Sequence, residues 1–350
     1  MSVQAPPTSI TTRIVRVQAF QILLVLIAIW VVFAILEGDR FATVGNMRLV
    51  AQNAAILAIL GVGMTFVIIT AGIDLSIGSV MVFSGVIGAK VMVAQGGDGW
   101  GTAWLGIAAS VAAGLAWGLV NGVLVAKAKI PPLIVTLGTL GMALGLAQII
   151  TKGVDIREVP LVMQSKIGYG NAFGDVPMLA GIALVFLVVG GVVLHLTRFG
   201  RHTYAIGSNE EAARRVGLKV DRHLIAVYAI SGGLAGVAGI LSLAQFATTA
   251  IAGQSQTNLN VIAAVVIGGT SLFGGVGTIF GTVVGLFIPA VLQNGFIIVG
   301  IQPFWQQVAV GAVLIVAVYV DQLRRAAAQR GGRTNVLSRL RGRESTSNEE

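Results

Sequence analysis

Long apolar runs separated by short polar segments dominate this sequence of 350 residues. A helix needs about 20 mainly apolar residues to cross the hydrocarbon core of a bilayer. Runs near that length lie at residues 20–36, 49–70, 76–94, 104–126, 133–151, 178–196, 223–246, 257–272, 276–299 and 303–320. The run at 257–272 is the shortest and also suits a re-entrant segment. The pattern predicts an all-α integral membrane protein with about ten transmembrane helices.

The composition supports a membrane protein. Hydrophobic residues make up 55% of the chain and charged residues 11%, whereas soluble domains carry about 25% charged residues. The chain has no cysteine, which excludes disulfides and thiolate metal sites. The net charge of +9 raises nucleic-acid binding as an alternative. The placement of the basic residues favours a membrane instead, and we expect no nucleic-acid partner.

Lysine and arginine gather on alternate loops. Ten crossings with both termini inside put most of the 23 basic residues on the cytoplasmic side, as the positive-inside rule requires. We therefore expect a multi-pass protein of the cell membrane. Residues 1–19 would form a cytoplasmic segment and residues 20–320 the transmembrane domain. Residues 321–350 would form a basic, partly disordered cytoplasmic tail that faces anionic lipid.

Glycines recur every four residues in two of the apolar runs. The two stripes are Gly114-x3-Gly118-x3-Gly122 and Gly277-x3-Gly281-x3-Gly285. Inside a bilayer, helices associate through close backbone approach rather than through the hydrophobic effect. We therefore expect both stripes to be packing seams, within the subunit or between two copies.

The longest loop on the expected cytoplasmic side spans residues 197–222 and contains a helix signal at 207–217. Ser208 and Glu211 fit a capping box. Two acidic residues begin the helix and two basic residues end it, which suits the helix dipole, and Gly217 suits its C-terminal stop. A helix of about two turns is marginal alone and too polar for the bilayer. Either the rest of the loop or a partner protein must hold it.

Four separated motifs resemble one known family, the ribose-type monosaccharide permeases of ABC importers, within the sugar and branched-chain amino acid permease superfamily. The motifs are GVGMTFVIITAGIDLSIGS at 61–79, IPPLIVTLGT at 130–139, YAIGSNEEAA at 204–213 and IAAVVIGGTSL at 262–272. The likeness covers residues 45–320. It implies the ABC importer permease fold and a transport subunit rather than an enzyme.

The resemblance also implies partners and a role for the loop helix. The helix would be a coupling helix that docks into a cytoplasmic ABC ATPase subunit. The coupling candidates are Ser208, Asn209, Glu210, Glu211, Ala212, Ala213 and Gly217. An extracytoplasmic solute-binding protein and a second permease copy, identical or a paralogue, would complete the importer. The expected solute is small and hydroxylated: a monosaccharide such as ribose, another pentose or hexose, or a polyol.

The sequence departs from the family just before Val261. An acidic pair is usual there, and this chain has Asn258 and Asn260. The departure leaves the exact sugar open. A permease for branched-chain amino acids, nucleosides or autoinducer-2 remains an alternative, although neutral amides favour a sugar or polyol.

Asp74 is the one acidic residue within an otherwise apolar region. A charge at membrane depth usually faces the protein interior or a water-filled cavity. Gly72, Asp74, Ser76 and Gly78 together predict a discontinuous helix in which Asp74 caps the second half. A cap and a direct place in the solute pathway both remain open. In either case we expect Asp74 to be buried.

Other polar residues within the apolar runs are further candidates for the solute pathway. The full candidate set is Asn53, Asp74, Ser76, Gln245, Asn260, Gln293 and Asn294. Neutral amides suit a hydroxyl-rich ligand because each one both donates and accepts hydrogen bonds. The alternative for each amide is a hydrogen bond between helices.

The sequence lacks the residues that several other function classes require. The segment 269–274 is followed by Gly275 rather than by the lysine of a phosphate-binding loop, so a separate subunit must hydrolyse ATP. The three histidines lack metal-ligand spacing, and we expect neither a metal nor a cofactor. A secondary transporter needs ionisable residues in its spans, for which only Asp74 and Lys90 qualify. A membrane enzyme needs clustered acids or histidines, which the sequence does not show.

Overall fold

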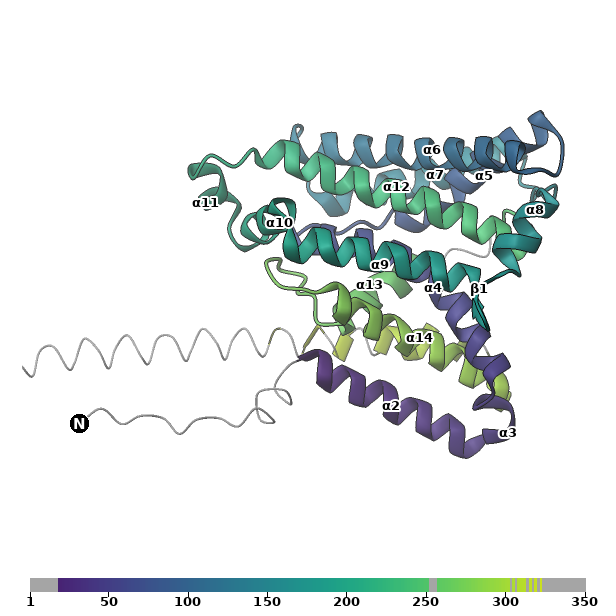
Figure 1. Ribbon diagram of the computed structural model, residues 1–350. Coiled ribbons are helices and arrows are strands. Elements are labelled where there is room, and N and C mark those ends of the chain that lie inside the picture. Colours follow the sequence, from purple (N-terminus) through teal and green to yellow (C-terminus); the bar gives the residue numbers. More distant parts are fainter. Residues whose placement is uncertain are drawn as a thin grey trace, which may run out of the picture.

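The computed structural model describes residues 18–251, 257–302 and, with gaps at 306, 313, 314, 317, 320 and 321, residues 304–322. The described chain is a bundle of helices that run roughly along one direction (Figure 1). One short antiparallel hairpin interrupts it, formed by β1 (Asn171–Phe173) and β2 (Val176–Pro177). The predicted all-α fold class is confirmed.

Within the described residues, seven helices are long and apolar enough to cross a membrane. They are α4 (Val44–Ile69), α5 (Ile77–Gln95), α6 (Trp100–Ala126), α7 (Pro132–Thr151), α9 (Met178–Leu196), α12 (Val220–Phe246) and α14 (Ile279–Val299). The first predicted run corresponds to α2 (Gln18–Leu36). The predicted run at 257–272 is helical only as α13 (Thr257–Ile267), since Gly269 adopts a φ of +93°. The tenth run, 303–320, lies partly outside the described residues, so the count of ten is approximate.

Five short elements connect the long helices. They are α3 (Gly38–Phe41), α8 (Leu161–Met163), the π-helix η1 (Gln164–Gly168), α10 (Arg198–Ser208) and α11 (Glu210–Arg215). Helices α10 and α11 lie at one end of the bundle, beside the start of α2, and we call this the α11 end. Helices α3 and α8 and the hairpin lie at the other, the α3 end (Figure 1).

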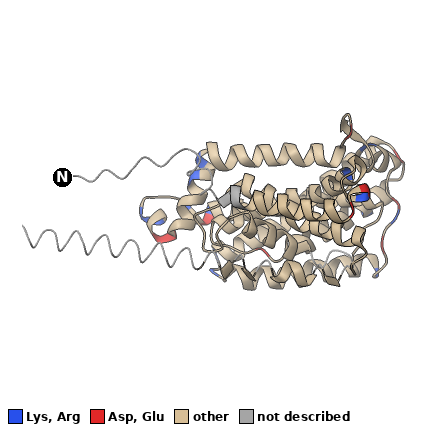
Figure 2. Ribbon diagram, turned by 90° about the horizontal axis from the view of Figure 1, so that it is seen from below, with Lys and Arg blue, Asp and Glu red and all other residues tan. Residues whose placement is uncertain are grey.

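Charged residues gather at the two ends of the bundle, and its middle is almost free of them (Figure 2). Such a distribution matches a protein whose middle lies in hydrocarbon, where a charge is costly. The outer surface agrees, because α9 exposes Leu184, Val185 and Val188. Helix α4 is the central helix. Of its most apolar 18-residue stretch 83% is buried, against 22% for α9.

Both predicted glycine stripes are packing seams. A Cβ atom on Gly118 would lie 2.3 Å from the carbonyl oxygen of Tyr228, and one on Gly114 would lie 2.2 Å from that of Gly232. Helices α6 and α12 therefore touch through their backbones, which no side chain larger than hydrogen would permit. The second stripe packs α14 on α13, with a Cβ atom on Gly285 placed 2.0 Å from a carbonyl oxygen of α13.

The chain is not helical between α4 and α5, as the glycine and serine pattern predicts. Ala71 in this break has a φ of +62°. Backbone groups freed by the break find partners elsewhere in the protein: the amide of Gly275 donates to the carbonyl oxygen of Ile69 at 2.9 Å. Irregular backbone at membrane depth is tolerated only where the protein satisfies it in this way.

Candidate functional site

The N-cap of the short helix α11 is Asn209 rather than Ser208. The Asn209 side chain accepts a hydrogen bond from the amide of Ala212 at 2.9 Å. The predicted capping box of Ser208 and Glu211 is wrong because α10 continues through Ser208. The chain turns only at Asn209, whose φ of −162° is extended. Glu211 instead pairs with Arg215, one helical turn away, at 2.5 Å.

Gly217 ends the helix region as predicted. Its φ is +86°, a conformation that glycine adopts without steric cost. Its amide donates to the carbonyl oxygen of Arg214 at 3.0 Å, and the amide of Leu218 donates to that of Ala213 at 3.1 Å. These bonds satisfy carbonyl groups that the helix end would leave free.

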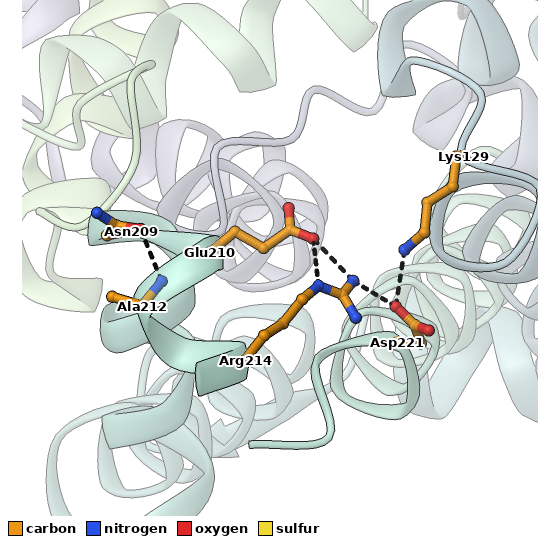
Figure 3. Close-up of polar contacts among 6 residues, drawn as sticks. All are labelled: Lys129, Asn209, Glu210, Ala212, Arg214 and Asp221. Atoms are coloured by element: carbon orange, nitrogen blue, oxygen red, sulfur yellow. Dashed lines mark hydrogen bonds and ion pairs between the residues drawn. The ribbon is translucent and has the colours of Figure 1, made fainter. Parts of the chain in front are cut away.

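A row of alternating charges fastens α11 to the bundle (Figure 3). Arg214 contacts Glu210 on its own helix at 2.8 Å and Asp221, at the start of α12, at 2.5 Å. Asp221 also accepts from Lys129, in the loop after α6, at 2.8 Å. Hydrogen bonds to Asp221 and Glu210 raise the pKa of the Arg214 guanidinium above its usual value. The contact between Asp221 and Lys129 was not predicted from the sequence, because the two residues are 92 positions apart in the chain.

The inner face of α11 is apolar. Ala213 is 4% exposed and packs in a small cluster with Ala126, Ile206, Val220 and Leu224. The rest of the chain therefore holds this side of the helix, which was one of the two possibilities left open by the sequence. The other six coupling candidates, Ser208, Asn209, Glu210, Glu211, Ala212 and Gly217, are all exposed. Beside them, Val216 is 77% exposed, an apolar side chain that the sequence interpretation missed.

Helix α10 rests on the break between α4 and α5. A Cβ atom on Gly207 would lie 1.7 Å from the carbonyl oxygen of Ile69, so only glycine fits at this contact. The Tyr204 hydroxyl donates to the carbonyl oxygen of Gly277 at 2.6 Å, in the segment between α13 and α14. Thr203 of α10 also contacts His223 of α12 at 2.9 Å, so α10 joins the break to α12.

Asp74 is 3% exposed, which confirms the expected burial. One carboxylate oxygen accepts from the amide of Ser76 at 2.9 Å and from its hydroxyl at 2.6 Å. The other accepts from Ser231 of α12 at 3.2 Å. The residue that precedes α5 is Ser76, so Asp74 stabilises the turn before the helix rather than its first turn. Asn121 of α6 donates to the Ser76 hydroxyl at 2.9 Å.

The break is fastened from a third side by Asn258. Its side-chain oxygen accepts from the amide of Gly78, in the first turn of α5, at 2.6 Å. Asn258 is 6% exposed. It is one of the two asparagines at which this chain departs from the acidic pair usual in similar permeases. An amide oxygen can cap a helix as a carboxylate does, without placing a second charge near Asp74.

Three of the amide candidates are hydrogen-bonded in the half of the bundle nearer the α3 end, two to each other and one to Asn46, which was not a candidate. Gln245 of α12 donates to Asn53 of α4 at 3.0 Å. Asn294 of α14 and Asn46 of α4 exchange two hydrogen bonds of 2.8 Å each. The other two candidates stand apart from these pairs: Gln293 is exposed and Asn260 is half-buried. The pathway candidates therefore do not meet in one site, and Asp74 with Ser76 forms a separate group at the break.

Two cavities lie near the ends of the bundle. One, of about 260 Å³, lies between α11 and the break and is lined by Glu210, Lys129, Thr70 and Gly72, among others. The second, of about 650 Å³, is lined by Lys90 of α5 and by the segment after α7, including Arg157 and Glu158. Among the described residues, no three histidine, aspartate or glutamate side chains are grouped as a metal site.

Known proteins match most of this chain. The family model described as branched-chain amino acid transport system / permease component matches residues 46–318. The ribose import permease protein of Escherichia coli strain K12 is 36% identical over 301 residues, 85% of this chain and 92% of the relative. No solved structure is significantly similar to the chain.

Two further relatives carry the names of other sugars. The fructose import permease protein of Rhizobium meliloti is 34% identical over 313 residues, 87% of this chain and 86% of the relative. The D-allose transport system permease protein of Escherichia coli strain K12 is 35% identical over 315 residues, 87% of this chain and 90% of the relative. These relatives are transport subunits rather than enzymes. The chain therefore belongs to the permease-component family of these transport systems, the multi-pass membrane subunits of ABC importers.

Proposed function

We propose that this chain is the permease subunit of an ABC importer that carries a monosaccharide or a similar small hydroxylated solute into the cytoplasm. The observation that carries the proposal is the likeness, over most of the chain, to import permeases for ribose, fructose and allose. The neutral amides Asn53 and Gln245 agree with such a solute, because a hydroxyl-rich ligand needs partners that both donate and accept. A branched-chain amino acid would need partners for two charges.

The α11 end is the cytoplasmic end in this proposal, with both termini in the cytoplasm. The support comes from the basic residues of the segment 197–222, which include Arg198, Arg201, Arg214 and Arg215. Cytoplasmic loops of membrane proteins carry such an excess of lysine and arginine. The basic segment after residue 323 follows the last predicted span and would lie on the same side.

Helix α11 serves as the coupling helix that contacts the ATPase subunit. Its exposed side chains are polar, and the exposed apolar side chain of Val216 directly follows its last residue. Protein interfaces combine apolar and polar side chains in this way. The sequence itself lacks a phosphate-binding loop. ATP hydrolysis therefore belongs to a separate cytoplasmic subunit.

A second copy of the chain or a paralogue completes the membrane part, and the solute passes between the two. A solute-binding protein docks at the α3 end, where the cavity lined by Lys90, Arg157 and Glu158 opens. Binding of ATP draws the two coupling helices together and shifts the population from one facing state to the other. Membrane lipid surrounds the apolar outer faces.

Purification of the chain together with its cognate ATPase and binding protein tests the proposal. We expect a stable complex whose ATPase rate rises when the binding protein carries a monosaccharide. Stimulation by a branched-chain amino acid but not by any monosaccharide would show that the solute is an amino acid rather than a sugar. A chain that assembles with no ATPase would refute the importer assignment.

A further inference from the structure

Asp221 is the point at which three separate segments of the chain meet. It lies at the start of α12 and accepts from Arg214 of α11 at 2.5 Å and from Lys129, in the loop after α6, at 2.8 Å. Both cations contact the same oxygen, Oδ1. No other carboxylate among the described residues contacts two cations. Figure 3 shows Arg214 also turned toward Glu210, so the charges alternate in a row.

The row of charges adds little to the stability of the protein, but it helps to define the position of α11. The side chains of Lys129, Arg214 and Asp221 are 56%, 37% and 40% exposed, and ion pairs this open to water are weak. The apolar contact of α11 is also small, since Ala213 offers a single methyl group. The backbone also connects α11 to α12, through residues 216–219 and the hydrogen bond from the amide of Leu218 to the carbonyl oxygen of Ala213. The ion pairs with Asp221 add the side-chain contacts that join α11 to both α12 and the loop after α6.

Asp221 lies in α12 and Lys129 follows α6, and these two helices form one unit. Helices α6 and α12 touch backbone to backbone along the glycine stripe, where a Cβ atom on Gly122 would lie 2.7 Å from the Cα atom of Ile225. Such a seam resists sliding because packed interfaces have discrete arrangements. A displacement of α11 that is transmitted through Asp221 therefore moves α6 and α12 together.

Helix α10 contacts two parts of the bundle. Gly207 rests on the carbonyl oxygen of Ile69, at the end of α4, and Tyr204 donates to the carbonyl oxygen of Gly277. Thr203 of α10 also contacts His223 of α12 at 2.9 Å. The cavity of about 260 Å³ is lined by Glu210 and Lys129 and by residues 70–72. The segment from α10 to α11 thus joins the break after α4 to the α6–α12 unit, and Asp221 fastens the α11 side of this connection.

We propose that Asp221 is a positioning residue that fixes α11 to the α6–α12 unit, so that movement of α11 displaces this unit relative to the break after α4. The proposal rests on the assignment of α11 as the coupling helix. In this proposal, Lys129 and Arg214 are the two cations that bind Asp221, and through it they link the loop after α6 to α11. Asp221 touches neither the solute nor ATP, and its effect appears in how tightly the two processes are linked.

The test uses the complete importer, reconstituted in proteoliposomes with its ATPase and binding protein. Asp221→Asn keeps the shape of the side chain and removes the charge that holds both cations. We expect the ATP hydrolysed per solute molecule imported to rise at least about fivefold, the lower range for coupling between sites, with little change in melting temperature. Asp221→Glu should restore the ratio toward the wild-type value, which a purely structural role does not require.

Three further variants make every outcome informative. Lys129→Gln removes one of the two ion pairs of Asp221 and should also raise the ATP hydrolysed per solute molecule imported. This variant keeps the proposal testable if Asp221→Asn fails to reach the membrane. Lys127→Gln, an exposed cation of the same loop, should leave the ratio unchanged. If Ala213→Trp uncouples the importer while Asp221→Asn and Lys129→Gln do not, α11 couples but Asp221 does not position it. If none of these variants changes the ratio, the assignment of α11 itself fails.

Discussion

Asn46 and Asn294 exchange two side-chain hydrogen bonds of 2.8 Å each and so tie the start of α4 to the end of α14. Asn46 also donates to the carbonyl oxygen of Phe41. The sequence marked Asn294 as a candidate for the solute pathway, with a hydrogen bond between helices as the alternative. The geometry favours the alternative, because both functional groups of the Asn294 amide are used within the chain.

Replacement of Asn294 should therefore affect stability rather than solute choice. Asn294→Leu leaves the Asn46 amide without its partner, which costs about 1–3 kcal/mol for a buried polar group. Thermal unfolding in detergent should begin at a lower temperature, while the surviving protein keeps its solute preference. Gln293→Leu, at an exposed neighbour, is the control for stability. Loss of transport by Asn294→Leu at an unchanged melting temperature would place Asn294 in the pathway.

Asp74 should tolerate asparagine and reject leucine. Asn keeps an oxygen for the amide and hydroxyl of Ser76, and the Ser231 hydroxyl can turn to accept from its amide group. Leucine leaves all three donors unpaired, and each costs about 1–3 kcal/mol when buried. We expect near-normal membrane expression of Asp74→Asn and severe loss of Asp74→Leu. Well-expressed Asp74→Asn protein that moves no solute would identify Asp74 as a pathway residue instead.

Orientation is open to direct labelling because the chain contains no cysteine. Ser208 and Lys166 are both exposed. Ser208 ends α10 and Lys166 lies in η1, directly after α8, and α10 and α8 lie at opposite ends of the bundle (Figure 1). Ser208→Cys should react with a membrane-impermeant reagent only after the cytoplasmic side is opened, and Lys166→Cys should react on intact cells. Reaction of Ser208→Cys on intact cells would reverse the whole orientation.

Helix α11 offers two ways to disturb coupling. Ala213 is 4% exposed, so Ala213→Trp has no space and must push the helix away from the bundle. Glu211→Lys instead reverses a charge on the exposed face. Both variants should fold in the membrane, hydrolyse ATP with their ATPase and import little solute. Normal uptake by both would remove the coupling assignment.

The glycine seam between α6 and α12 should be intolerant of any side chain. A Cβ atom on Gly118 would lie 2.3 Å from a carbonyl oxygen of α12, a distance at which the backbones must separate. Gly118→Ala should lower the melting temperature strongly and reduce membrane expression. The control is Gly138→Ala on α7, where a Cβ atom meets no other atom within 4 Å. Equal stability of the two variants would contradict the packing role of the seam.

The sequence predicts the long elements well because the bilayer dictates their length and character. The ends of α7 and α9 fall within one residue of the predicted runs. The run at 257–272 was predicted five residues too long, because α13 ends at Ile267 and hydropathy alone does not distinguish Gly268 and Gly269 from the apolar residues of a helix. Ser208 and Asn209 are both good cap residues and adjacent, and only the backbone conformation shows which one the chain uses.

Tertiary contacts account for what the sequence missed at the candidate site. The bond between Asn258 and Gly78 spans 180 positions, and that between Ser231 and Asp74 spans 157. No local sequence pattern predicts either contact. Asp221 likewise follows an ordinary basic loop, and its importance appears only when the fold brings Lys129 and Arg214 to it.

Uptake of labelled sugar tests the central claim most directly. The permease, its ATPase and its binding protein are reconstituted in proteoliposomes, and ATP-dependent accumulation of ribose, fructose and allose is compared with that of leucine. We predict that at least one monosaccharide accumulates, that accumulation requires both ATP and the binding protein, and that leucine neither accumulates nor competes. Accumulation of leucine alone, or of a sugar without ATP, would contradict the account.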